Sequence, residues 1–125
     1  MKIALLCMTS LLLAAPAHAD AVADSLAQWQ PQATRAFSAT RGQQLWLQDH
    51  QERSCSTCHG TDARQQGRHQ NTGKTIAAMA PSVNPKRLTA TSQIEKWLGR
   101  NCRWTLGREC SAQEKGDLIL WLGQQ

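Results

Sequence analysis

The pentapeptide Cys55-Ser56-Thr57-Cys58-His59 constrains this chain of 125 residues more than any other feature. Cys-x-x-Cys-His is the attachment motif of c-type haem, in which two thiols bond to the porphyrin and the histidine ligates the iron. The spacing suits this chemistry because one helical turn brings both sulfurs to the porphyrin edge and the imidazole beneath its centre. The motif predicts one covalent haem c, attached through Cys55 and Cys58, with His59 as the proximal iron ligand.

Cys-x-x-Cys also occurs in structural zinc sites and in thioredoxin-like redox pairs. A structural zinc site usually needs a second pair of ligands, and the sequence contains no second Cys-x-x-Cys and no pair of histidines at zinc-finger spacing. A thioredoxin-like motif would lie in a βαβ unit, for which the chain shows no pattern. Haem attachment is therefore favoured over both alternatives.

The amino terminus has the pattern of an export signal. Lys2 forms a short basic region, residues 3–15 an apolar region, and Ala17-His18-Ala19 an A-x-A cleavage site. The apolar region is shorter than the roughly 20 residues that span a bilayer. We expect a signal peptide over residues 1–19, cleaved after Ala19, and one haem domain over residues 20–125 without a membrane span. In a bacterium, the mature protein would lie in the periplasm.

The charge of the chain is mildly basic. Of 14 basic and 9 acidic residues, cleavage removes Lys2, which leaves 13 against 9 and a formal charge of +4. Two haem propionates would lower this to about +2. Such a balance suits docking to an acidic redox protein and is too weak for a nucleic-acid partner. The basic residues expected to border the haem edge are Arg64, Arg68, Lys74, Lys86 and Arg87.

Counting cysteines predicts a disulfide. Of the five, Cys7 leaves with the signal peptide and two belong to the haem motif, so Cys102 and Cys110 remain. An even pair in an oxidising compartment is by default bonded. The short loop that this bond closes is worth roughly 2.5 kcal/mol in the chain-entropy model.

The remaining patterns predict an all-α domain. Proline ends a helix, and a serine followed three residues later by a glutamate forms a capping box that opens one. Polar and proline-containing segments are expected to be loops. The expected helices cover 21–30, 38–50, a segment opened by Ser92 and Glu95, and a terminal segment opened by Ser111 and Glu114, with loops over 60–75 and 76–88.

Two apolar segments flank the haem motif and resemble those of a class I c-type cytochrome. The first is Gly42-x-x-Leu45-Trp46 and the second is Leu118-x-x-Trp121-Leu122. In that fold, an amino-terminal and a carboxy-terminal helix cross at a small residue and pack against one covalent haem. The resemblance implies that Gly42 marks this crossing.

The second half of the chain resembles the Sphaeroides haem protein family, a relative of cytochrome c double-prime. The residues that carry this resemblance are Thr72-Gly73-Lys74, Met79-Ala80-Pro81, Val83-Asn84-Pro85-Lys86-Arg87-Leu88, Glu95-Lys96-Trp97, Asn101-Cys102 and Cys110-Ser111-x-x-Glu114-Lys115-Gly116-Asp117. In that family, an asparagine before the first disulfide cysteine ligates the iron and detaches on reduction, where cytochrome c double-prime has a histidine. The resemblance implies this role for Asn101. It also implies binding of small ligands such as oxygen, and a dihaem cytochrome c as redox partner.

The residues themselves leave the sixth iron ligand open. Asn101 follows Ile94 by seven positions, which places it on the apolar face of its helix, where its amide needs a partner. Iron would be one partner, and a helix C-cap explains the asparagine equally well; the resemblance favours the iron. Met79 is the rival ligand, as in ordinary carriers, and would otherwise pack on the haem edge. His50 and His69 are expected to be exposed.

The sequence thus favours a periplasmic monohaem cytochrome c that transfers electrons through a high-spin haem with labile Asn101 as the sixth ligand. Alternatives are a gas-binding or oxygen-handling haem protein, an ordinary carrier ligated by His59 and Met79, and a haem domain of a larger complex. No catalytic residue is predicted, and we expect no enzyme activity beyond slow reduction of oxygen.

Overall fold

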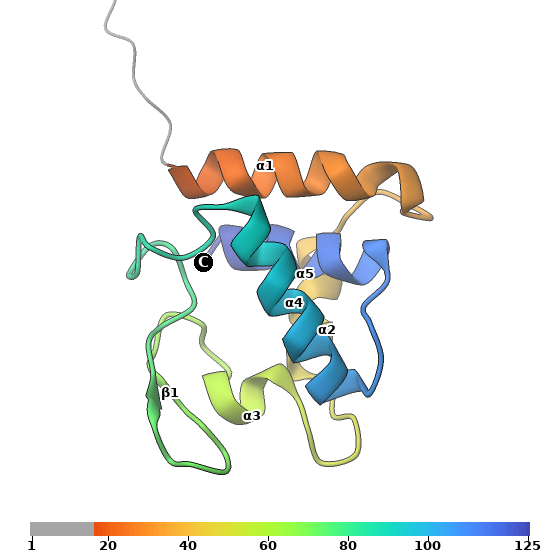
Figure 1. Cartoon of the computed structure of the whole chain (residues 1–125). Coiled ribbons are helices and arrows are strands. Elements are labelled where there is room, and N and C mark those ends of the chain that lie inside the picture. Colours follow the sequence, from red (N-terminus) through yellow and green to blue (C-terminus); the bar gives the residue numbers. More distant parts are fainter. Residues whose placement is uncertain (1–16) are drawn as a thin grey trace, which may run out of the picture.

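The computed structural model describes residues 17–125 and places five α-helices around a shared core (Figure 1). Apart from one short helical turn and a hairpin of two-residue strands, the regular elements are α-helices, which confirms the all-α prediction. None of the described helices has the length and apolar character needed to cross a membrane. The elements are α1 (Ala17–Trp29), the 3-10 turn η1 (Gln30–Gln32), α2 (Ala39–Leu47), α3 (Cys55–His59), β1 (Gly67–Arg68), β2 (Thr75–Ile76), α4 (Thr91–Leu106) and α5 (Ala112–Gly123).

Most of the expected signal peptide, residues 1–16, lies outside the described residues, and Ala17 to Ala19 form the start of α1. The α-helix ends at Trp29, two residues before Pro31, which lies in η1. Proline is tolerated at the start of such a turn, and its missing amide cannot continue an α-helix. The helix predicted over 21–30 is thus present and begins four residues earlier.

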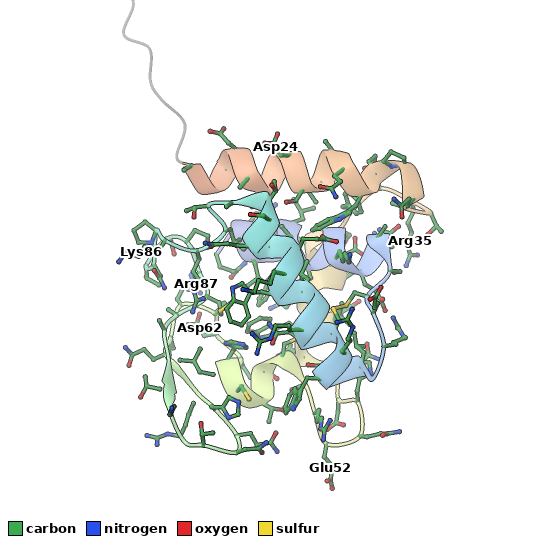
Figure 2. The ribbon with its side chains drawn as sticks, in the orientation of Figure 1. Asp24, Arg35, Glu52, Asp62, Lys86 and Arg87 are labelled. Carbon is green, nitrogen blue, oxygen red and sulfur yellow. A yellow bond between two sulfur atoms is a disulfide. The ribbon has the colours of Figure 1, made fainter. Side chains whose placement is uncertain are left out.

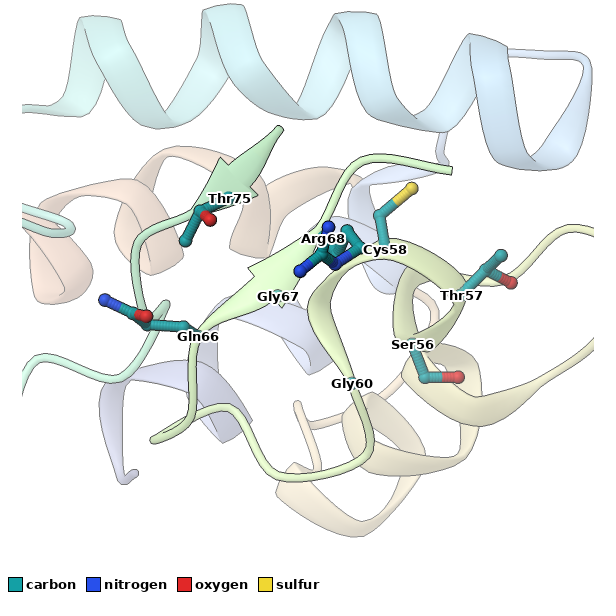
Figure 3. A pocket seen from close by; sticks show the side chains of 8 residues that line it. All are labelled: Ser56, Thr57, Cys58, Gly60, Gln66, Gly67, Arg68 and Thr75. Carbon is teal, nitrogen blue, oxygen red and sulfur yellow. The ribbon is translucent and has the colours of Figure 1, made fainter. Parts of the chain in front are cut away.

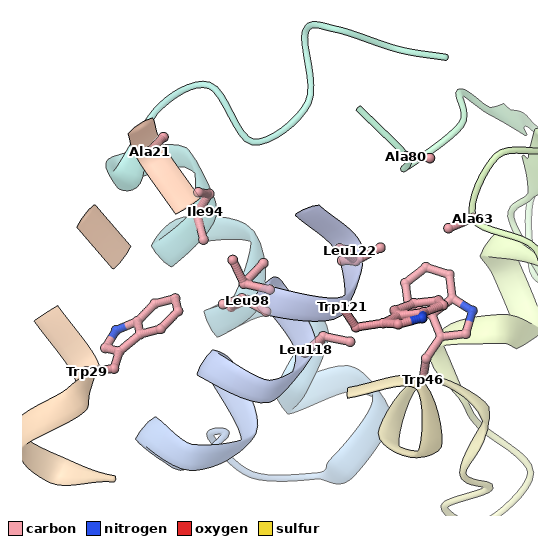
Figure 4. Packing of buried hydrophobic residues seen from close by; sticks show 11 residues of the cluster. Ala21, Trp29, Trp46, Ala63, Ala80, Ile94, Leu98, Leu118, Trp121 and Leu122 are labelled. Atoms are coloured by element: carbon pink, nitrogen blue, oxygen red, sulfur yellow. The ribbon is translucent and has the colours of Figure 1, made fainter. Parts of the chain in front are cut away.

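The crossing of α2 and α5 forms the centre of the fold. A Cβ added to Gly42 would lie 2.6 Å from the carbonyl carbon of Asp117 and 2.8 Å from Cβ of Trp121. The absence of a side chain therefore lets the two backbones approach, as predicted. Beside this contact the rings of Trp46 and Trp121 pack with centroids 5.2 Å apart, and Leu118 and Leu122 extend the buried cluster (Figure 4).

A buried carboxylate ties the start of α2 to α5. Asp117 accepts hydrogen bonds from the Ser38 amide (2.7 Å), from Nε (2.7 Å) and Nη2 (2.9 Å) of Arg41, and from Nε2 of Gln113 (3.0 Å). A charge taken out of water is tolerated when it is paired and its oxygens are satisfied in this way. No sequence pattern indicated this network, because Ser38 and Arg41 lie 79 and 76 positions before Asp117.

One helix end and one helix start differ from the prediction, and another helix start agrees with it. The helix predicted over 38–50 ends at Leu47, so its last three residues belong to the following loop. The Ser92 capping box is wrong, since α4 begins at Thr91 after extended Ala90 and Ser92 lies within its first turn. The Ser111 box is confirmed, with Glu114 N donating to Ser111 Oγ (3.2 Å) and Ser111 N donating to Glu114 Oε2 (2.8 Å).

Candidate haem site

The pentapeptide forms its own short helix, α3, because both ends are capped. The Thr57 amide donates to Oγ of Ser54 (3.0 Å), and the Ser54 amide donates to Oγ1 of Thr57 (3.0 Å). This reciprocal cap satisfies two amides that a helix start leaves unpaired. Gly60 ends the helix with a φ of 76°, a conformation that favours glycine. The sequence itself therefore sets Cys55, Cys58 and His59 on one helical turn.

Two neighbouring segments hold α3 in place. Trp46 Nε1 donates to the Gly60 carbonyl (2.8 Å), and the Trp46 ring lies 5.4 Å from the His59 ring, so α2 supports the helix from one side. The β1–β2 hairpin, within the segment predicted to be a loop, packs against α3 at Gly67. A Cβ on Gly67 would lie 2.8 Å from Cα of His59, so this approach requires a glycine.

The donor groups of α3 are in the state that haem attachment needs. Among residues 17–125, Cys55 and Cys58 form no disulfide. Nδ1 of His59 is buried and has no hydrogen-bond partner in the described part of the chain. Burial, and after it the nearby Arg87 guanidinium, lowers the pKa of His59 to about 4, and burial raises the pKa of Cys55 to about 11. At neutral pH the imidazole is therefore uncharged, the form that ligates a metal.

The distal candidate lies on α4. Ile94 and Leu98 are buried against the core, whereas Trp97 is 49% exposed and Asn101 is exposed. Asn101 is thus not buried as the periodicity predicted, although Cys102 beside it and Thr105 one turn further on are buried. An exposed tryptophan one turn from an asparagine forms a partly apolar surface, which suits contact with a porphyrin.

Met79 is partly buried in a segment fixed by its backbone. The amides of Met79 and Ala80 both donate to the Ala63 carbonyl at 2.9 Å. Arg87 holds the same segment, with Nε donating to the Ala78 carbonyl (3.0 Å) and Nη2 to the Ala77 carbonyl (2.9 Å). This burial lowers the pKa of Arg87. Arg87 is therefore a half-buried bracing residue, whereas the sequence placed it with the exposed basic residues (Figure 2).

The other basic residues expected near the haem edge are exposed: Arg64, Arg68, Lys74 and Lys86. His50 and His69 differ from the prediction, since both are half-buried. Nε2 of His50 is buried without a partner among residues 17–125. Nδ1 of His69 accepts the amides of Asn71 (3.3 Å) and Thr72 (3.2 Å), which fixes the hairpin tip.

A surface pocket of about 340 Å³ lies between α3 and the hairpin (Figure 3). Of the three attachment residues only Cys58 lines it, and in the figure its sulfur points away from Ser56 and toward the helix that crosses above. Cys55 and His59 do not contribute to this pocket. The pocket therefore borders the attachment helix at Cys58 and extends along the hairpin.

Cys102 and Cys110 lie where a disulfide joins the last turns of α4 to the start of α5, with a Cα–Cα distance of 5.6 Å. Asn101 is therefore the residue directly before a cross-link. Within the described residues no group of three or more His, Cys, Asp or Glu side chains could hold a metal ion. The side chains of this site are those that a covalently attached haem would need: two thiols for attachment and one neutral imidazole on α3, with an asparagine on α4 as the candidate sixth ligand.

Comparison with known proteins places the chain among c-type cytochromes. A family described as a domain of unknown function, DUF1924, matches residues 32–122. The chain is 42% identical to the cytochrome c-type protein SHP of Cereibacter sphaeroides, covering 93% of this chain and 95% of that protein. It is 37% identical over 71 residues to cytochrome c'' of Methylophilus methylotrophus, covering 57% of this chain and 49% of that one.

Solved structures show the same fold. The structure of oxidised SHP, described as an oxygen-binding cytochrome c, superposes with a TM-score of 0.76 at 41% identity and covers 83% of this chain and 96% of its own. Oxidised cytochrome c'' from Methylophilus methylotrophus superposes with a TM-score of 0.76 at 27% identity, covering 87% and 94%. The helical cytochrome c fold predicted from the sequence is thereby confirmed.

Proposed function

Because the chain belongs to the Sphaeroides haem protein family of c-type cytochromes, we propose that it is a periplasmic monohaem electron carrier with Asn101 as a redox-labile sixth iron ligand. Cys55 and Cys58 hold the covalent haem c, and His59 is the proximal ligand. When bound, the haem supplies a redox-active iron that exchanges single electrons and takes up small ligands. The support for the rest of the proposal comes from how α4 presents Asn101.

The exposure of Asn101 carries the proposal. It shares its helix face with buried Ile94 and lies one turn from half-exposed Trp97, so this face of α4 presents an exposed indole and an exposed amide within one turn of each other. An amide oxygen is a neutral dipole, and its attraction to a metal falls when the metal loses positive charge. Asn101 is therefore suited to ligate the iron in the oxidised protein and to dissociate from it in the reduced protein.

The adjacent cross-link lets Asn101 act reversibly. Cys102 follows Asn101 directly and lies in disulfide contact with Cys110 at the start of α5. A short closed loop limits how far the end of α4 can move, so little conformational freedom is lost each time the side chain returns. A weak ligand can then persist in one redox state and rebind after release.

Release of Asn101 would give small molecules access to the distal side. The related SHP is described as an oxygen-binding cytochrome c. We extend this property to the present chain, with a gas-binding or oxygen-handling role as the alternative to electron transfer. The rival carrier ligated by Met79 requires that side chain to leave its contacts with the core cluster.

The redox partner in this proposal is an acidic protein, such as a dihaem cytochrome c, that meets the exposed basic residues. Arg68 and Lys86 are exposed, one before and one after the segment that contains Met79. The charge of Arg64 is partly neutralised by Asp62, whose Oδ1 lies 3.1 Å from Nε of Arg64. The electron-transfer rate with such a partner should fall as salt shortens the Debye length toward about 10 Å. A rate independent of salt would count against this surface.

Paired variants test the ligand assignment. Asn101→Ala should convert the oxidised protein to a five-coordinate or water-ligated spectrum, speed cyanide binding, and leave the reduced spectrum almost unchanged. Met79→Ala serves as the matched control and should leave the oxidised spectrum unchanged. The assignment is wrong if Met79→Ala removes a low-spin oxidised species while Asn101→Ala has no effect.

A further inference from the structure

An arginine just before the haem motif reaches the end of the helix that carries Asn101. Nη1 of Arg53 donates to the backbone carbonyl of Trp104 (3.1 Å), and its guanidinium carbon lies 5.0 Å from the centre of the Trp104 ring. Arg53 is two residues from Cys55, and Trp104 is one turn beyond Asn101. The contact therefore joins the attachment segment to the distal helix directly.

The accepting carbonyl is one that the helix leaves free. Trp104 is among the last residues of α4, which ends at Leu106, and the final carbonyls of a helix have no partner within it. The Gly107 amide already caps the carbonyl of Arg103. A cation at this end also matches the negative pole of the helix dipole. Arg53 thus supplies both a donor and a charge where α4 requires them.

The loop that presents Arg53 is strained. Gln51 and Glu52 have φ values of 55° and 66°, between two hydrogen bonds that join His50 and Arg53 (N–O distances of 2.7 and 3.3 Å). Two successive positive φ angles in such a turn are typical of type I′, which favours Asn-Gly rather than two long side chains. Backbone strain of this kind persists where the surrounding contacts determine the conformation.

The disulfide does not fix the distance between the end of α4 and the haem-attachment helix α3. The Cys102–Cys110 bond ties the end of α4 to α5, and Arg103 pairs with Glu109 within the same loop (2.6 Å). Neither contact involves α3 or the residues before it. In Figure 1 the end of α4 lies next to the loop that enters α3. The distance between the distal helix and His59 therefore depends on a contact such as that of Arg53.

We propose that Arg53 is a positioning residue that holds the end of α4, and with it Asn101, at a set distance from the haem-attachment helix. The functional part of this inference rests on the proposed role of Asn101. Without Arg53, the last turn of α4 opens more often and the asparagine is released more often in the oxidised protein. Arg53 touches neither the iron nor its ligands, so its effect passes through the position of α4.

Four oxidised holoproteins test the inference: the unaltered protein, Arg53→Ala, Arg53→Lys and Arg103→Ala. The last removes the same charge at the end of α4 without loosening the contact with Trp104. Amide hydrogen exchange in residues 102–107 should be roughly threefold to tenfold faster in Arg53→Ala, with a similar rise in the rate of cyanide binding. Arg53→Lys should restore part of both values, and Arg103→Ala should change neither.

Equal exchange and equal cyanide rates in Arg53→Ala and Arg103→Ala would overturn the role of Arg53. Asn101→Ala, measured alongside, separates this claim from the proposed function. If Asn101→Ala changes the oxidised spectrum and Arg53→Ala leaves the cyanide rate unaltered, the proposed function stands and the positioning role falls. If Asn101→Ala has no spectral effect, the proposed function falls, and the exchange rates alone decide whether Arg53 fixes the end of α4.

Discussion

Replacement of Gly42 by alanine should strongly destabilise the core, although it adds only one methyl group. The new Cβ would lie 2.6 Å from the carbonyl carbon of Asp117 and 2.8 Å from Cβ of Trp121, so the α5 backbone has to move. Overpacking of this kind costs about 1–3 kcal/mol or more. Movement of Asp117 also disturbs its charged hydrogen bonds, each worth about 1.5–3 kcal/mol. Alanine regains about 1 kcal/mol of helix propensity, which leaves a net loss of about 2–4 kcal/mol.

Gly99→Ala is the matched control, because Gly99 lies inside α4 and a Cβ there would have nothing within 4 Å. This variant should gain about 0.5–1 kcal/mol from helix propensity alone. The assay is urea unfolding of the holoproteins followed by far-ultraviolet circular dichroism. A Gly42→Ala protein as stable as the unaltered one would refute the close crossing of α2 and α5.

Three further predictions concern single groups. The Arg108 side chain holds the pKa of Glu114 at about 2, below its ordinary 4.5, so this carboxylate stabilises the fold above pH 4.5 and the contribution is lost between pH 4.5 and 2. Glu114→Gln should lower the free energy of unfolding by about 1–2 kcal/mol at pH 7, after allowance for solvent screening. It should also reduce the fall of that free energy, measured by urea unfolding, as the pH is lowered through the acid range; an unchanged fall would contradict this. Replacing Cys102 and Cys110 by serine should lower the unfolding free energy by roughly 2.5 kcal/mol, and two free thiols in the unfolded, non-reduced protein would disprove the cross-link. Haem colour should survive acid-acetone extraction and be lost from a Cys55→Ala, Cys58→Ala protein; colour extracted from the unaltered protein would disprove covalent attachment.

The parts of the fold that follow from short-range patterns were predictable. The α3 motif, the Ser111 capping box and the glycine at the α2–α5 crossing each depend on residues a few positions apart, or on one residue type required at one place. The reciprocal cap of Ser54 and Thr57 depends on residues equally close in the chain. The Ser92 box shows the limit of such signals. Ala90 is the N-cap residue of α4, so Ser92 already lies inside the helix and cannot cap it.

The contacts that brace the site were not predictable, because they join distant residues through common side chains. Nothing near Arg87 indicates that it binds the carbonyls of Ala77 and Ala78, and nothing near Arg53 indicates Trp104. The exposure of Asn101 depends on which segments pack against that face of α4, which the periodicity of one helix does not show. Tertiary packing determines the contacts of Arg87, the contact of Arg53 and the exposure of Asn101.

The central claim is that Asn101 ligates the iron in the oxidised protein and leaves it on reduction. A crystal structure of the oxidised holoprotein, followed by reduction of the same crystals, measures this directly. We expect the Asn101 side-chain oxygen on the iron opposite His59 before reduction, and the same side chain displaced afterwards with the Cys102–Cys110 bond intact. Met79 sulfur on the iron in both states, or Asn101 bound equally in both, would contradict it.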